Sequence, residues 1–313
     1  MEEKNIATIL ERPRPTLFAA TLIVLIATLG LWVGSFAALM IAPRSGIAQE
    51  VVVNVVYYLP FVALPLALYM RRHRGLSDAL RLNPMPLLPT LTVALLAVVS
   101  VFAASALDSL WMLLLGAVGL EAIQPSLTIG TSRELTIHIL NTAALPAVCE
   151  EFLFRGFVLS AWESRGTRLA GWVSAALFSM MHANLFGLPA YLMVGLVSGF
   201  LVFALDTLYA GIVYHTVYNA TILALLYVAS ANPGLAQAGG GVQAVSYATE
   251  LLMSLTFMAA MLLSVNMRRR LTGIGAVPRI REPLARRERA LLVALLAVML
   301  GAMAAALLPG GIA

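Results

Sequence analysis

Three short segments place ionisable and amide side chains inside apolar stretches of the chain. The segments are 147–157 (AVCEEFLFRGF), 178–186 (FSMMHANLF) and 211–221 (GIVYHTVYNAT). The residues that they offer for chemistry are Glu150, Glu151, Arg155, Phe178, His182, His215 and Asn219. An ionisable group within a bilayer costs on the order of 3 kcal/mol on insertion scales, so a membrane protein that retains several usually needs them for its function.

The first segment predicts different roles for two adjacent glutamates. Glu151 and Arg155 are four residues apart, so on a helix they share one face and can form an ion pair. Glu150 is rotated from Glu151 by about 100° on an ideal helix, and we expect its carboxylate to face another partner. The alternative is that all three residues form one buried ion network without chemistry.

The other two segments supply imidazole and amide groups. His215 and Asn219 are also four apart, and their N–H groups can together stabilise an oxyanion, although such a pair can equally join two helices. His182 taken alone is more typical of a hydrogen-bonded histidine in a protein core. Together, a carboxylate, two imidazoles and an amide on three helices are the groups needed to activate water and stabilise a tetrahedral intermediate.

The composition indicates the kind of scaffold that carries these groups. Of the 313 residues, 61% are hydrophobic and 11% charged, whereas a soluble domain has about 25% charged residues. A soluble enzyme, a disordered chain and a disulfide scaffold are excluded, the last because Cys149 is the only cysteine. The fold predicted is all-α, a polytopic transmembrane helix bundle with eight or nine spans. The candidate spans lie near 16–42, 48–70, 87–119, 135–160, 168–185, 189–206, 210–230, 248–267 and 290–308.

The basic residues predict how this bundle is oriented. With the N-terminus in the cytoplasm and nine alternating spans, 17 of the 20 Lys and Arg residues fall in cytoplasmic segments. We therefore expect a multi-pass protein of the cytoplasmic (inner) membrane with an external C-terminus, and no nucleic-acid partner. We divide it into N-terminal transmembrane helices (1–134), a catalytic helical core (135–230), and a C-terminal part (231–313) with an external loop, two spans and an Arg-rich cytoplasmic loop.

These predicted spans do not put the candidate residues at one depth. Counted from the cytoplasmic ends, Glu150, His182 and His215 lie about 15, 21 and 8 Å into the bilayer. The long third span is expected to tilt, to break near Gly116 or to include an interfacial piece. Within it, Asp108 is expected to cap such a break or to face a water-filled cavity.

The ordered motifs resemble a known family. Glu150-Glu151-x-x-x-Arg155, Phe178-x-x-x-His182 and His215-x-x-x-Asn219 are similar to the motif set of the CPBP family, also called the Abi family, of CAAX prenyl endopeptidases and bacteriocin-processing enzymes. The resemblance covers residues 135–230. It implies a glutamate-type intramembrane endopeptidase that needs no cofactor and acts on a peptide or protein at or in the lipid bilayer.

The resemblance also implies roles for the motif residues. Glu150 and His182 activate water, and His215 and Asn219 form the oxyanion hole. Glu151, Arg155 and Phe178 support the site. The Arg- and Ala-rich composition with a single lysine suggests a GC-rich bacterial genome, which makes CAAX processing a less expected task than cleavage of another membrane-associated substrate.

Two alternatives remain open from the sequence. One is a zinc-dependent membrane peptidase that uses Glu150 or Glu151 with His182 and His215 as ligands, although the chain has no HExxH pair. The other is a non-catalytic membrane protein, such as an immunity factor, a scaffold or a transporter, in which buried Glu and His form a proton relay.

Overall fold

The predicted all-α membrane fold is confirmed. The structure is a computed structural model that describes residues 14–41, 47–73, 80–120, 127–232, 243–271 and 283–307. These residues form helices, turns and loops and contain no strand. Among them are eight helical rods long and apolar enough to cross a membrane, in agreement with the predicted eight or nine spans.

In the described ranges, seven helices are uninterrupted, and two further rods are built from consecutive helical pieces. The uninterrupted helices are α2 (Leu17–Ile41), α6 (Leu87–Ala117), α10 (Thr167–Met181), α11 (Leu188–Leu205), α12 (Leu208–Ala231), α13 (Gln243–Leu271) and α14 (Arg286–Ala306). The first composite rod is α3 (Ile47–Tyr58), η1 (Leu59–Ala63) and α4 (Leu64–Arg72). The second, which carries both glutamates, is α7 (Ser132–His138), η2 (Ile139–Ala144), α8 (Leu145–Glu151), η3 (Phe152–Val158) and α9 (Leu159–Glu163).

Local sequence explains where the second composite rod begins and where two of the three π-helical pieces form. Thr131 and Glu134 form a capping box that starts α7, with the Glu134 backbone N–H donating to Thr131 Oγ1 at 3.2 Å. Pro60 and Pro146 lack a backbone N–H, so the turns beside them widen into the π-helical pieces η1 and η2. By contrast, α6 is a single helix that ends at Ala117, one residue after Gly116, so the position considered for a break marks the end of the helix.

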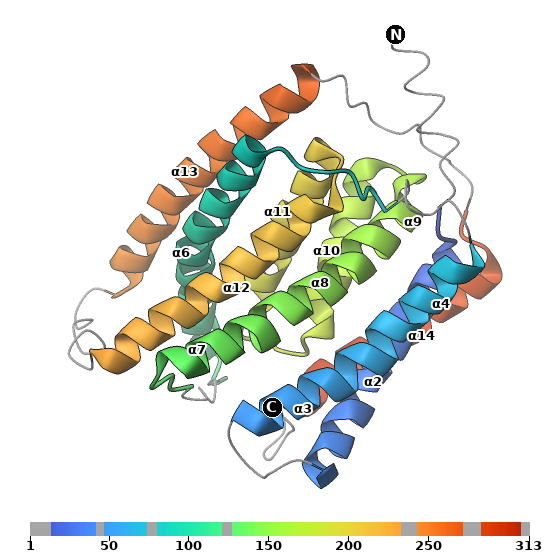
Figure 1. The fold of residues 1–313 in the computed structure, drawn as a ribbon, viewed down its shortest axis with the longest axis horizontal. Coiled ribbons are helices and arrows are strands. Elements are labelled where there is room, and N and C mark those ends of the chain that lie inside the picture. The colour runs from blue at the N-terminus through green and yellow to red at the C-terminus, as the bar shows by residue number, and fades with distance from the viewer. Residues whose placement is uncertain are drawn as a thin grey trace.

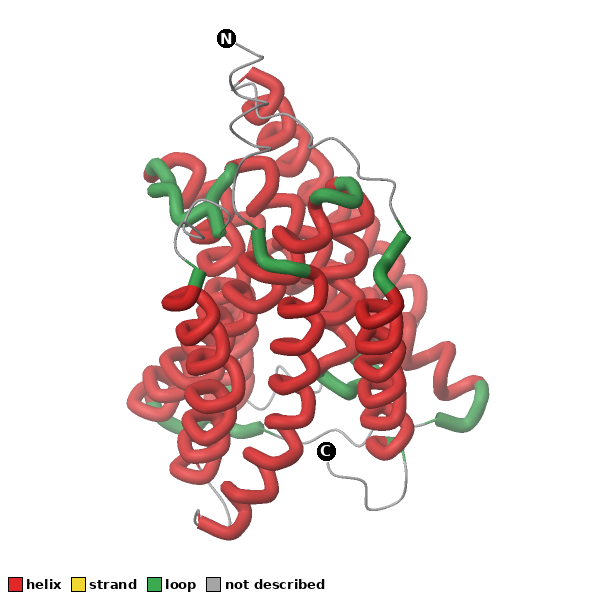
Figure 2. Tube along the Cα trace, turned by 90° about the vertical axis from the view of Figure 1, so that its right-hand side faces the viewer, coloured by secondary structure: helices red, strands yellow, loops and turns green. Residues whose placement is uncertain are grey.

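Two outer groups of helices flank a central set. Figure 1 shows α2, α3, α4 and α14 together at one side of the bundle and α6 with α13 at the other, with α8, α10, α11 and α12 between them. Turned by 90°, most of the helices follow roughly one common direction (Figure 2). The composite rod with the glutamates therefore lies between the two groups.

One end of the bundle is held by an ionic cluster, which we call the end cluster: buried Arg81 and Glu163 with partly exposed Asp206. Arg81 Nη2 donates to Glu163 Oε1 at 2.6 Å and Arg81 Nε donates to Asp206 Oδ1 at 2.9 Å. The Arg81 carbonyl accepts a hydrogen bond of 2.8 Å from the backbone N–H of Leu208, the first residue of α12. The end of α9, the α11–α12 turn and the segment before α6 thus meet at this end.

The opposite end is tied from α6 to the start of α11. Trp111 Nε1 donates to the Leu185 carbonyl at 2.9 Å, and the Ala190 N–H donates to Asp108 Oδ1 at 3.2 Å. Asp108 thus caps the first turn of α11 from a neighbouring helix, and not a break in its own helix. Because α10 starts beside Glu163 and ends beside Leu185, it runs from one end of the bundle to the other, although its 15 residues leave it out of the eight membrane-length rods.

We expect α10 to be a ninth crossing. In a Cys149→Ser background, single cysteines at exposed Arg168 and exposed Asn184 should react with a membrane-impermeant thiol reagent from opposite sides of the membrane. The arginine distribution predicts that Arg168→Cys reacts from the cytoplasmic side. Labelling of both positions from the same side would show that α10 does not cross.

Candidate active site

The predicted ion pair lies at the centre of the buried polar cluster. Arg155 Nη1 donates to Glu151 Oε1 at 2.8 Å, and both side chains are inaccessible to solvent. Arg155 Nη2 donates to the Gly195 carbonyl of α11 at 3.0 Å. The pair predicted from the four-residue spacing is therefore present, and it also binds the neighbouring helix.

Glu151 makes a second contact with α11 and connects α12 to the site. Its Oε2 accepts a hydrogen bond of 2.6 Å from Ser198 Oγ on α11, and its Oε1 lies 3.2 Å from His215 Nδ1 on α12. A carboxylate only accepts hydrogen bonds, so Nδ1 carries the proton in this contact. His215 thus contacts a glutamate although the sequence predicted different depths for the two segments. Part of the difference arises because α12 begins at Leu208 and not at residue 210.

Phe178 lies between the two histidines. Its ring centroid is 4.8 Å from that of His182 and 5.6 Å from that of His215, both edge to face. The guanidinium carbon of Arg155 lies 4.5 Å from the centroid of the same ring. This buried ring therefore fixes the orientation of both imidazoles relative to the ion pair.

His182 is held in one tautomer. Its Nδ1 is 2.8 Å from the carbonyl oxygen of Phe178, which can only accept, so Nδ1 donates. In the neutral ring, Nε2 is then the unprotonated nitrogen and is available as a hydrogen-bond acceptor. The ring of Tyr191 on α11 stacks on the other face, with centroids 4.0 Å apart and planes inclined by 19°.

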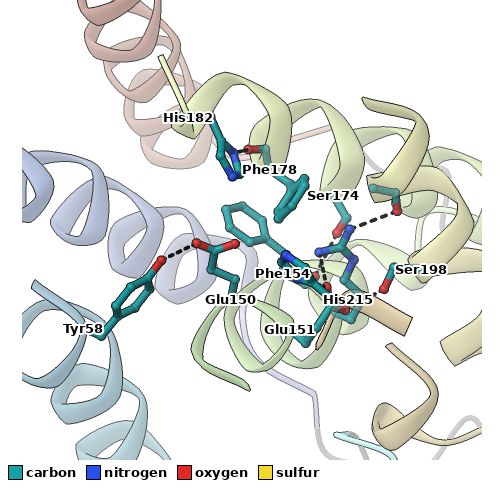
Figure 3. Close-up of polar contacts among 11 residues, drawn as sticks. Tyr58, Glu150, Glu151, Phe154, Ser174, Phe178, His182, Ser198 and His215 are labelled. Carbon is teal, nitrogen blue, oxygen red and sulfur yellow. Dashed lines mark hydrogen bonds and ion pairs between the residues drawn. The ribbon is translucent and has the colours of Figure 1, made fainter. Parts of the chain in front are cut away.

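Glu150 faces a different side of its helix from Glu151, as the helix geometry predicts (Figure 3). Its Oε1 accepts a hydrogen bond of 2.6 Å from the hydroxyl of Tyr58 at the end of α3. The carboxylate is buried and interacts electrostatically with His182, but within the described part of the chain the two side chains share no direct hydrogen bond. The interaction between the two groups is therefore electrostatic and not a direct hydrogen bond.

Asn219 lies one helical turn beyond His215 on α12 and is half-buried. Its side chain makes no hydrogen bond to the residues that the structure describes. Because it is four residues from His215 on the same helix, Asn219 shares the face of α12 that was predicted. Its N–H groups remain available to donate.

Other polar contacts at this site were not predicted from the sequence. Tyr58, Tyr191 and Ser198 each contact one of the predicted site residues from another helix. Their only signal in the sequence is a polar group inside an apolar span. In the described ranges, no three His, Cys, Asp or Glu side chains come together as a metal site.

The bundle and this cluster define a multi-pass membrane protein with a buried carboxylate–imidazole site. Residues 132–221 match the family model described as type II CAAX prenyl endopeptidase Rce1-like. The matched segment extends from the first residue of α7 into α12 and contains every motif residue, so the resemblance to the CAAX prenyl endopeptidase family is confirmed. It supports a CAAX-type protease in general. Comparisons with curated proteins and with solved structures gave no match.

The close approach of α12 to Glu151 requires glycine at position 211. A Cβ there would collide with the Glu151 carboxylate and lie 2.9 Å from Ser198 Oγ. We expect Gly211→Ala to lower the free energy of unfolding by about 1–3 kcal/mol, since buried overpacking has this cost. Thermal unfolding in detergent or nanodiscs measures the change.

Gly199→Ala is the matched control, because Gly199 is also buried in a membrane helix but a Cβ there meets nothing within 4 Å. Equal unfolding temperatures for the two variants would contradict the packing described for Gly211.

Proposed function

We propose that the chain is a glutamate-type intramembrane endopeptidase that cleaves a membrane-associated peptide or protein. The observation that carries the proposal is the difference between the two glutamates. Glu151 is engaged through both oxygens by Arg155, Ser198 and His215, whereas Glu150 is bonded by Tyr58 through Oε1 alone within the described residues. Glu150 Oε2 is therefore the carboxylate oxygen available to act as a base.

In the proposed reaction, Glu150 Oε2 takes a proton from a water molecule that is also hydrogen-bonded to His182 Nε2. The resulting hydroxide attacks the carbonyl carbon of the scissile peptide bond. When the tetrahedral intermediate collapses, Glu150 returns its proton to the leaving amine. Water is consumed, and one carboxyl and one amino terminus are formed.

The proposed oxyanion hole consists of His215 Nε2 and the amide of Asn219. His215 Nδ1 already donates to Glu151, so Nε2 donates as well only when the ring is doubly protonated. The Glu151 carboxylate then serves as the counter-charge beside the imidazolium. A fixed positive group of this kind stabilises the negative charge that develops in the transition state.

The proposed location follows from the bundle and from the arginine distribution. We propose that the protein lies in the cytoplasmic membrane with its N-terminus in the cytoplasm, and that its partners are the bilayer and the substrate. The description of the matched family makes a farnesylated CAAX peptide the first probe to test.

We expect Glu150→Gln to abolish cleavage, because the amide retains the shape of the side chain but cannot take the proton. The measurement compares membrane-peptide profiles of cells that contain the wild type or the variant, together with cleavage of an internally quenched farnesylated CAAX peptide by purified protein. Glu250→Gln on α13 is the matched control. If Glu150→Gln is folded and its profile equals that of the wild type, the protease proposal is wrong.

The zinc peptidase alternative is tested separately. We expect cleavage to persist after treatment with a zinc chelator, because in the described part of the chain no three His, Cys, Asp or Glu side chains, Glu150 included, come together as metal ligands, and the Glu151 carboxylate is already bonded to Arg155, Ser198 and His215 Nδ1. Rates before and after chelation, and after addition of zinc, provide the measurement. Loss of activity that zinc restores would favour the zinc mechanism instead.

A further inference from the structure

Tyr58 contacts the proposed base from outside the segment that matches the family. It is the last residue of α3, whereas the matched segment begins at residue 132. Its hydroxyl donates to Glu150 Oε1 at 2.6 Å, and Tyr58 and Glu150 are only 6% and 5% exposed. This length is typical of a hydroxyl bound to an ionised carboxylate, which is one of the stronger hydrogen bonds in proteins.

The position of this hydroxyl is set by a polar stripe on α3, formed by Glu50, Asn54 and Tyr58. The three residues are four apart, so they share one face of the helix. Each contacts the composite rod that carries Glu150. Glu50 Oε2 lies 3.1 Å from Nδ1 of buried His138, and Asn54 Nδ2 donates to the Asn141 carbonyl at 3.0 Å.

The stripe therefore aligns α3 along the composite rod. In a bilayer, apolar side chains provide little hydrophobic driving force for helix association, so polar contacts and close packing have a larger share in it. The contacts of Glu50 and Asn54 hold the earlier turns of α3 against the rod, and the last residue of the helix, Tyr58, therefore lies against Glu150. The neighbouring Tyr57 points elsewhere, since its hydroxyl contacts Met181 Sδ at 3.7 Å.

The contact has a direct consequence for the carboxylate. Oε1 is bonded to Tyr58, which restricts the orientation of the carboxylate, and within the described residues Oε2 is the oxygen left for water. The charged and titratable groups around Glu150 come from several elements: Tyr57 and Tyr58 on α3, Cys149 beside it, Arg155 on η3, His182 at the C-cap of α10 and Tyr191 on α11. Of these, Tyr58 makes a hydrogen bond to it.

We infer that Tyr58 is a positioning residue for Glu150, so that the proposed active site extends to α3. This inference rests on the proposed role of Glu150 as the base. Tyr58 acts through Glu150: it holds the carboxylate with Oε2 toward the water and stabilises its charge. Removing the hydroxyl should therefore slow the chemical step and leave substrate binding nearly unchanged.

The experiment compares Tyr58→Phe with Tyr57→Phe in full-length protein purified into lipid nanodiscs. Each variant removes one hydroxyl from a buried tyrosine at the same end of α3. The kinetic probe is the internally quenched farnesylated CAAX peptide or, if it is not cleaved, a quenched peptide containing the bond that wild type cleaves and Glu150→Gln does not. We expect Tyr58→Phe to lower kcat by about tenfold or more with KM within about twofold, and Tyr57→Phe to change neither.

A second measurement needs no substrate. The carboxyl infrared band that disappears in Glu150→Gln should shift in Tyr58→Phe and stay in place in Tyr57→Phe. Thermal unfolding shows whether both variants are folded. Equal kcat for the two tyrosine variants, or an unshifted band, would overturn the inference while leaving the protease proposal intact if Glu150→Gln is inactive. Full activity of Glu150→Gln would instead remove the proposed function, and the role of Tyr58 with it.

Discussion

The buried ion pair of Glu151 and Arg155 is the interaction on which the arrangement of the site depends. Neither side chain is accessible to solvent, so the cost of removing both charges from water must be offset inside the protein. The pair alone does not offset it. Gly195 supplies a carbonyl, Ser198 a hydroxyl and His215 a ring N–H. Because these groups belong to α11 and α12, their hydrogen bonds to the pair bring three helical rods together at one point.

Small residues make this meeting possible. A Cβ at Gly195 would lie 2.9 Å from the Cα of Ala175, and one at Gly211 would collide with Glu151. The backbones of α10, α11 and α12 can therefore approach closely enough for their polar groups to reach the pair. The end cluster acts on the same geometry from farther away, because the Arg81 carbonyl accepts from the first residue of α12, two turns before His215.

Contacts within one helix could be predicted from the sequence, and contacts between helices could not. The four-residue spacing predicted the bond between Glu151 and Arg155, and the 100° rotation predicted that Glu150 faces elsewhere. The spacing says nothing about which residue on another rod Glu150 meets, so Tyr58 was missed. The depth calculation failed for a similar reason, since counting along each span ignores where a helix starts and how rods shift relative to one another.

The contacts also argue against the alternative that Glu150, Glu151 and Arg155 form one buried ion network without chemistry. Such a network is most stable when every buried charge is neutralised and every lone pair is used, and Glu151 approaches this condition. Glu150 does not, because among the described residues its hydrogen-bond partner is a neutral phenol on one oxygen, and the guanidinium of Arg155 bonds to the adjacent glutamate and to Gly195. A buried carboxylate kept apart from the nearest cation, beside an imidazole with an unprotonated Nε2, is costly for stability alone. It is well suited to a base that must accept a proton from water and later return it.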